Sequence, residues 1–121
     1  MIPGRPIATA FALLLLSGCG PDLKGDWKIT ANCRPESEYG EITILAEASV
    51  IETSKNEFSG EVRNNLGQSG RFIARLSENR LDTKTTWDGL DPTESVLVLD
   101  RSTNTFTGRD SNACDLIVVR P

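Results

Sequence analysis

The feature that most constrains this chain is a series of short segments, from Trp27 to the C-terminus, in which apolar and polar residues alternate. Clusters of Gly, Asn, Asp and Pro separate these segments, and none of them carries a sustained helical period. Successive side chains of a strand point to opposite faces, so a strand with one buried face shows this alternation. Short alternating segments with turn residues between them indicate an all-β sandwich or barrel.

We expect eight strands in this part of the chain. The clearest alternation lies at 41–51, where Ile, Ala and Val at the even positions share one face. Leu45 and Ile51 interrupt the opposite, polar face, a pattern that a covering loop would explain. Four apolar residues from Val96 to Leu99 follow one another without alternation, so the faces of that strand stay unassigned. The expected strands are 27–33, 41–51, 58–63, 71–76, 81–87, 95–100, 105–109 and 114–120.

The N-terminal region is an apolar leader. Arg5 and the free amine form a weakly basic head, and the run from Ile7 to Leu16 contains no charge. This run is shorter than the roughly 20 residues that a membrane-spanning helix needs, and it is typical of the apolar core of a signal peptide. Its end, Leu16-Ser17-Gly18-Cys19, closely resembles the lipobox of bacterial lipoproteins. An ordinary secretory signal with a chance cysteine is the alternative.

The lipobox resemblance implies a lipid-anchored protein. Cleavage would follow Gly18, the thiol of Cys19 would carry a diacylglycerol, and the new α-amine would receive a further acyl chain such as palmitate. Residues 1–18 would then be the signal peptide, 19–24 a lipidated tether and 25–121 a β-barrel domain. Two or more acyl chains hold a protein stably in a bilayer. In this family an Asp after the cysteine opposes outer-membrane sorting, so Gly20 implies the periplasmic face of the outer membrane, with the inner membrane as the alternative.

The charge balance and the absence of histidine exclude several classes of function. The chain has 13 Lys and Arg, 17 Asp and Glu and no His, which gives a formal net charge of −4. Removal of a leader that contains Arg5 would make it −5. This balance argues against binding of nucleic acid, which requires clustered positive charge. Without histidine, Ser-His and Cys-His nucleophiles and the commonest metal ligand are missing.

Two of the three cysteines are expected to form a disulfide. If Cys19 carries lipid, Cys33 and Cys114 remain as an even pair in an oxidising compartment. The loop that they would close covers nearly the whole domain, so chain entropy gives the bond a value of roughly 4 kcal/mol. Two free thiols are the alternative.

The same two cysteines indicate that the sheet closes. In an up-and-down meander of eight strands, the first and last become neighbours only on closure, and opposed residues in an antiparallel pair have a constant sum of positions. Cys33 with Cys114 and Trp27 with Arg120 share the sum 147. One register would therefore form the disulfide at one end and set Arg120 over the Trp27 indole at the other. Such a cation–π contact contributes roughly 0.5 to 2 kcal/mol.

A second resemblance lies at the start of the first strand. Gly25-Asp26-Trp27 is similar to the Gly-x-Trp signature of the calycin barrels, which include lipocalins, avidins and small barrel inhibitors of bacterial metalloproteases. In lipocalins a late arginine packs across this tryptophan, and Arg120 stands at the matching position. The resemblance implies a single small eight-stranded antiparallel up-and-down barrel. In the inhibitors an exposed N-terminal segment enters the protease, whereas here Cys19 would carry lipid at that end.

The interior of such a barrel is wide enough for its own side chains or for one small ligand. We expect its aromatic side chains to fill it, with a ligand-binding interior as the alternative. The aromatic residues with an expected inward side chain are Trp27, Phe58, Phe72, Trp87 and Phe106.

A short internal echo also stands out. Residues 56–60 and 104–108 share an Asn, a Phe two residues later and a Gly two residues after that. Duplication of a half-barrel would produce this echo, and so would a turn and strand pattern that recurs in many β proteins.

Three groups of charged residues are candidate sites: the loop 88–94; Glu36, Glu38 and Glu41; and Arg63, Arg71 and Arg75. The loop carries three carboxylates that could hold calcium, but it lacks the spacing of an EF-hand, and a solvated turn is favoured. The glutamates could offer paired carboxylates for acid–base chemistry, although nothing in the sequence marks one of them as perturbed. The arginines could form a basic stripe for an anionic partner, and a solvated face is favoured.

The hypothesis from the sequence is a monomeric lipoprotein of the cell envelope that acts as a non-catalytic binding or accessory module. It would be anchored in the bilayer through acylated Cys19 and would bind a protein partner in the envelope. No cofactor, metal or nucleic acid is expected. A calycin-type protease inhibitor and a structural envelope component without a ligand are the alternatives.

Overall fold

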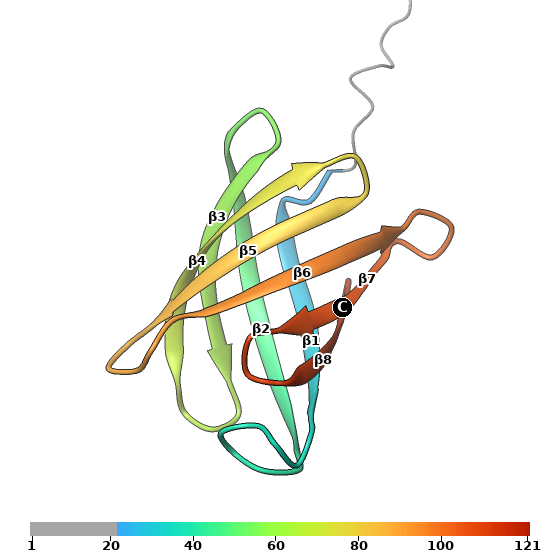
Figure 1. The fold of residues 1–121 in the computed structure, drawn as a ribbon. Coiled ribbons are helices and arrows are strands. Elements are labelled where there is room, and N and C mark those ends of the chain that lie inside the picture. Colours follow the sequence, from blue (N-terminus) through green and yellow to red (C-terminus); the bar gives the residue numbers. More distant parts are fainter. Residues whose placement is uncertain (1–21) are drawn as a thin grey trace, which may run out of the picture.

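Residues 22–121 form a closed all-β barrel in the computed structural model, which describes this part of the chain (Figure 1). The lipobox and the acylation expected at Cys19 lie outside the described residues. The described residues contain no helix long and apolar enough to cross a membrane. Eight antiparallel strands within 22–121 follow one another around the barrel, as the alternation predicts. They are β1 (Gly25–Cys33), β2 (Ile42–Ser54), β3 (Glu57–Asn64), β4 (Ser69–Ser77), β5 (Arg80–Trp87), β6 (Thr93–Asp100), β7 (Thr105–Asp110) and β8 (Cys114–Val119).

The barrel closes between β1 and β8 in the register that the cysteines predict. Cys33 is paired with Cys114 and Lys28 with Val119, so both pairs have the expected sum of positions. A disulfide joins Cys33 and Cys114, which confirms that prediction. Closure leaves neither β1 nor β8 with an unpaired edge, which in an open sheet would recruit other strands.

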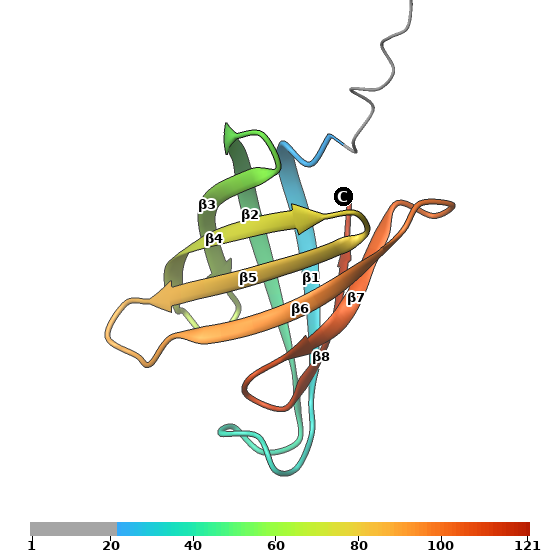
Figure 2. The ribbon, with the colours of Figure 1, turned by 45° about the horizontal axis from the view of Figure 1, so that its top comes forward.

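Up-and-down connectivity gives the barrel two different ends (Figure 2). At one, which we call the turn end, lie Asp22 and the short turns of the β2–β3, β4–β5 and β6–β7 hairpins. At the other, the loop end, lie segments 34–41, 65–68, 88–92 and 111–113 together with the disulfide. The chain therefore enters the barrel at the end opposite the longer loops.

The side chain of Trp27 and the residues that contact it close the turn end. The Trp27 indole Nε1 donates to the backbone oxygen of Leu23 at 2.8 Å, and the ring meets Phe106 edge-on with centroids 5.7 Å apart. The Arg120 guanidinium carbon lies 4.2 Å from the Trp27 ring centroid. Arg120 also donates to the backbone oxygens of Lys24, at 2.7 Å, and of Asp22. The extended β1–β8 register thus brings Arg120 to Trp27 and ties down the start of the domain.

The internal echo marks two matching bends. Asn56 and Asn104 both adopt left-handed backbone angles, with φ of 64° and 55°, in hairpin turns of the turn end. In the strands that follow, a Cβ on Gly60 would overlap the backbone oxygen of Ser49, and one on Gly108 would overlap that of Val96. Only glycine permits so close an approach between neighbouring strands. The echo therefore has a structural cause, whatever the origin of the two halves.

The structure decides two questions about which strand residues face solvent. Leu45 and Ile51 are 52% and 61% exposed, so the prediction of a covering loop is wrong. The loop residue Asn65 bonds to the backbone of Leu45 but leaves the Leu45 side chain exposed. In β6, Leu97 and Leu99 are buried in the interior, and Val96 and Val98 face solvent.

Candidate functional site: a cavity inside the barrel

A cavity of about 180 Å³ occupies the barrel interior, so the prediction of a filled core is wrong. All five aromatic side chains face inward and line the cavity, as expected, but they do not fill it: Trp27, Phe58 and Phe106 are buried, whereas Phe72 and Trp87 are only partly buried. The space arises because four inward positions on β1, β2 and β4 carry a single methyl group. These positions are Ala31, Ala46, Ala48 and Ala74.

The size of the cavity limits what it could hold. An apolar cavity of roughly 150 Å³ in a protein core accommodates benzene. Pockets for drug-sized ligands begin at roughly 300 Å³. A volume of about 180 Å³ therefore suits a molecule of about one ring with a short substituent.

The two sides of the cavity differ in chemistry. The side formed by β1, β2 and β3 is aliphatic and aromatic, with Ile29, Ile44, Val50, Phe58 and Val62 besides the alanines. The side formed by β5 and β6 carries hydroxyl groups. They belong to Thr83, Thr85, Thr93 and Ser95.

The hydroxyl side is an ordered hydrogen-bonded surface. Thr83 and Ser95 are opposed residues of β5 and β6, and their hydroxyl groups form a short hydrogen bond. Nearer the loop end, the Trp87 indole Nε1 donates to the Thr93 Oγ1 at 3.0 Å. These contacts fix the positions of three hydroxyl oxygens and one indole ring in the wall.

Asp110 extends this polar surface onto β7, where it is the residue opposed to Ser95. Its Oδ1 accepts the backbone N–H groups of Asn112, at 2.9 Å, and Cys114, at 3.0 Å. Burial raises the pKa of the Asp110 carboxyl and outweighs the lowering by these two hydrogen bonds, and the negative charge of Asp115 raises it further. Asp110 is thus a carboxylate partly withdrawn from water at the wall of an apolar cavity.

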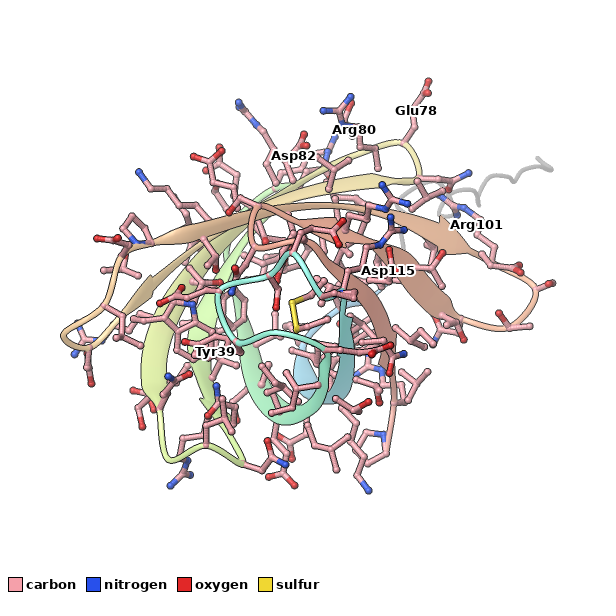
Figure 3. All side chains as sticks on the ribbon, turned by 60° about the horizontal axis from the view of Figure 1, so that its bottom comes forward. Tyr39, Glu78, Arg80, Asp82, Arg101 and Asp115 are labelled. Atoms are coloured by element: carbon pink, nitrogen blue, oxygen red, sulfur yellow. A yellow bond between two sulfur atoms is a disulfide. The ribbon has the colours of Figure 1, made fainter. Side chains whose placement is uncertain are left out.

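Four segments of the loop end reach the cavity through Tyr39, Gln68, Leu90 and Asn112. Gln68 donates to the Tyr39 hydroxyl at 3.0 Å, and Asn64 donates to the Gln68 side-chain oxygen at 2.7 Å. Figure 3 looks onto this end and shows the loop that carries Tyr39 crossing it beside the disulfide. We call this rim the mouth of the cavity.

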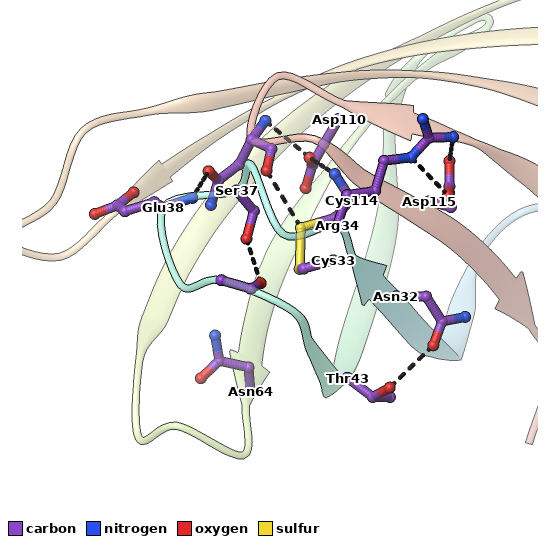
Figure 4. The surroundings of a disulfide bond; sticks show 12 residues. Asn32, Cys33, Arg34, Ser37, Glu38, Thr43, Asn64, Asp110, Cys114 and Asp115 are labelled. Carbon is purple, nitrogen blue, oxygen red and sulfur yellow. Dashed lines mark hydrogen bonds and ion pairs between the residues drawn. A yellow bond between two sulfur atoms is a disulfide. The ribbon is translucent and has the colours of Figure 1, made fainter.

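The disulfide and an ion-pair cluster hold the mouth in place (Figure 4). Asp115 accepts from Arg34 at 3.2 Å and from Arg109 at 2.9 Å. The Arg34 hydrogen bond, followed by that of Arg109, lowers the pKa of the Asp115 carboxyl. Loop 34–41 is also fastened to the β7–β8 turn, because the backbone N–H of Glu38 donates to the Asn112 side chain at 2.8 Å.

The structure separates the charged groups that the sequence singles out. Glu38 and, from loop 88–94, Asp91 lie at the mouth, whereas Glu36 and Glu41 are exposed outside the cavity lining. Within residues 22–121 no three His, Cys, Asp or Glu side chains are grouped as a metal site would require. Arg63, Arg71 and Arg75 form no basic stripe. Each stands opposite a glutamate on a neighbouring strand: Glu47, Glu61 and Glu57 respectively.

Sequence reasoning missed the polar residues of the cavity. Thr83 and Thr85 share the inward face of β5 with Leu81 and Trp87, and that pattern was visible in the sequence. Asp110 gave no such signal, because its burial depends on the disulfide turn that follows it and on β6 beside it.

The fold and the cavity together define a small closed antiparallel barrel with a partly polar interior. A solved structure described as a redesigned β-barrel, mFAP1, bound to DFHBI is similar to it, with a TM-score of 0.59 and 18% identity over 82% of this chain and 94% of that one. At this identity the similarity shows the fold alone, a small antiparallel β-barrel, as the sequence predicts. The sequence matches no protein-family model, and a search of curated proteins finds no significant match.

Proposed function

We propose that this protein is a non-catalytic binding module that holds one small, largely apolar molecule inside its barrel. The observation that carries the proposal is the interior cavity of about 180 Å³, with one aliphatic side and one hydroxyl-bearing side. Small-molecule sites are typically concave and mostly apolar, with a few polar groups that fix the orientation of the ligand. The redesigned barrel of similar fold is described as bound to DFHBI, which is consistent with ligand binding by this class of barrel.

The proposal includes a place in the cell envelope. If Cys19 is acylated, the tether would join the domain at Asp22, on the turn end, while the cavity opens at the loop end. The mouth would then face away from the bilayer that holds the anchor. Ligand would enter from the aqueous compartment, which for the proposed outer-membrane location is the periplasm.

Replacement of Cys19 by serine tests the anchor independently of the barrel. We expect loss of lipid labelling and of membrane association in the same variant, because the sulfur that would carry the diacylglycerol is gone. Metabolic labelling with a palmitate analogue and fractionation of membranes measure both. A variant that stays in the membrane fraction without lipid would contradict the proposed anchor.

Calorimetric titration of the domain with small neutral compounds tests the cavity. We expect saturable binding of benzyl alcohol, 2-phenylethanol or 1-hexanol, and a change in Trp87 fluorescence, since that indole lines the cavity. Ala46→Leu should weaken binding by at least about tenfold, because the added side chain occupies the space. Because the added side chain enters open space, Ala46→Leu should lower the free energy of unfolding by less than the roughly 1 to 3 kcal/mol that overpacking of a filled core costs.

The matched control is Ser49→Leu, a similar change on the exposed face of the same strand. It should leave binding unchanged. Absence of saturable binding by all three compounds up to their solubility would overturn the proposed function, and so would equal effects of the two leucines.

Protease inhibition is not favoured by the described residues. In calycin-type inhibitors an exposed N-terminal segment enters the protease, but here residues 22–24 are held on the barrel by Trp27 and Arg120.

A further inference from the structure

We infer that the cavity selects a small organic cation, an apolar body with an ammonium group that Asp110 and the hydroxyl groups beside it hold. This inference rests on the proposed function and narrows its ligand to one chemical class. Three observations carry it: the charges that line the cavity, the partners of Asp110 and the row of acceptors in which Asp110 stands.

Every charged side chain that lines the cavity is a carboxylate, and none is basic. Among the described residues in its wall, Glu38, Asp91 and Asp110 carry acidic side chains, and none is Lys or Arg. Low-dielectric walls concentrate the field of charges of one sign, so such a site attracts cations and repels anions. Fatty acids and other small carboxylates are therefore disfavoured, although the apolar side of the cavity would suit their chains.

Asp110 has no compensating charge within residues 22–121. Both of its protein hydrogen bonds go to Oδ1 and come from backbone N–H groups, which leaves Oδ2 without a described partner. The arginines nearby in sequence and fold, Arg34 and Arg109, both donate to Asp115. A partly buried carboxylate without a counter-charge is costly, and a bound cation would remove that cost.

The acceptors around Asp110 match an ammonium group. Thr83, Ser95 and Asp110 are successive opposed residues on β5, β6 and β7, so their side chains form one row across the wall. Ser95 is 9% exposed, and its only described side-chain partner is Thr83. An ammonium group has three N–H donors, and this row offers Oδ2 of the aspartate and two hydroxyl oxygens. A hydrogen bond between charged partners is roughly twice as strong as a neutral one.

A set of three probes of nearly equal size tests the selection: 2-phenylethylamine, 2-phenylethanol and phenylacetate. Each is titrated into the domain at pH 7 and low ionic strength by calorimetry. We expect the amine to bind at least about tenfold more tightly than the alcohol, because its hydrogen bonds to the Asp110 carboxylate join charged partners. The carboxylate should bind more weakly than the alcohol.

Asp110→Asn locates the effect. It should bring the affinity for the amine to within about threefold of that for the alcohol measured on the same variant. The control is Asp91→Asn, because Asp91 is an exposed carboxylate at the mouth. This variant should reduce the preference for the amine over the alcohol much less. If Asp110→Asn fails to fold, Ser95→Ala replaces it and should lower the affinity for the amine more than for the alcohol.

The outcomes separate this inference from the function on which it rests. Binding of the alcohol with no preference for the amine, or a preference that survives Asp110→Asn, overturns the cation and leaves the proposed function standing. Failure of all three probes to bind the wild-type domain overturns both.

Discussion

Arg120 shows how much one side chain near the chain terminus contributes to the barrel. Its guanidinium covers the Trp27 indole and also donates to two backbone oxygens of the segment 22–24. The sequence placed Arg120 beside Trp27, because a single register joins that pair to the cysteines. It gave no indication of the backbone hydrogen bonds, since Asp22 and Lys24 precede the first strand.

Arg120→Ala should destabilise the domain by about 2 to 4 kcal/mol. The variant loses a cation–π contact of roughly 0.5 to 2 kcal/mol and hydrogen bonds of roughly 1 kcal/mol each. Urea denaturation followed by tryptophan fluorescence measures the free energy of unfolding. Arg71→Ala, an exposed arginine on β4, should change it by less than about 0.5 kcal/mol. Equal effects of the two variants would contradict the role of Arg120.

Asp115 should make stability depend on pH in the acid range. Its hydrogen bonds with Arg34 and Arg109 lower the pKa of its carboxyl in the folded state. The stabilisation is therefore complete above the unfolded pKa, roughly 3.9, and is lost as pH falls through the lower folded pKa. Asp115→Asn should lose less stability than the wild type between pH 5 and pH 2, as thermal unfolding at each pH would measure. Parallel curves would show that Asp115 contributes nothing to the acid dependence.

At the scale of the elements, glycine rather than an apolar residue decides how two of the strands pack. Gly60 of β3 and Gly108 of β7 stand where the preceding strand approaches most closely, four strands apart in the barrel. The sequence showed this as an echo of unknown cause, because the contact that explains it joins different strands. Local alternation did predict the strands themselves, and it failed mainly where both faces are apolar, as in β6.

Gly60→Ala should destabilise the domain by more than about 2 kcal/mol or prevent its folding. Its Cβ would overlap the backbone oxygen of Ser49, and a backbone cannot move aside as a flexible side chain can. Ser59→Ala, the adjacent position on β3, is the control and should be tolerated. The measurement is the midpoint of chemical denaturation, and a midpoint for Gly60→Ala close to that of the control would contradict the close approach.

At the scale of the whole molecule, the disulfide joins the first and last strands and borders the mouth of the cavity. Cys33 and Cys114 are 81 residues apart in sequence, and Cys114 itself lines the cavity. The bond therefore restricts the conformations of the unfolded chain and also the movement of loop 34–41 in the folded domain. This couples the stability of the domain to the shape of the proposed binding site.

The double variant Cys33→Ala, Cys114→Ala should lose about 2 to 5 kcal/mol of stability, as is typical for a native disulfide of a small secreted domain. Guanidinium denaturation of the oxidised wild type and the variant measures the difference. The wild type under reducing conditions is the control and should approach the variant. Equal midpoints for oxidised and reduced wild type would show that the bond does not support the fold.

The amino-acid sequence by itself determined the fold class, the number of strands and the register in which the barrel closes. The fold class and the strand number follow from local alternation and turn residues, which are features of short segments. The closing register follows from the positions of one pair of cysteines. Only the tertiary structure decided that the interior holds a cavity and that Asp110 lies in its wall. The cavity is the small difference between the volume that eight strands enclose and the volume of their side chains, and the burial of Asp110 depends on neighbours from separate strands. Neither the volume of the cavity nor the burial of Asp110 can therefore be predicted from a single segment of the chain.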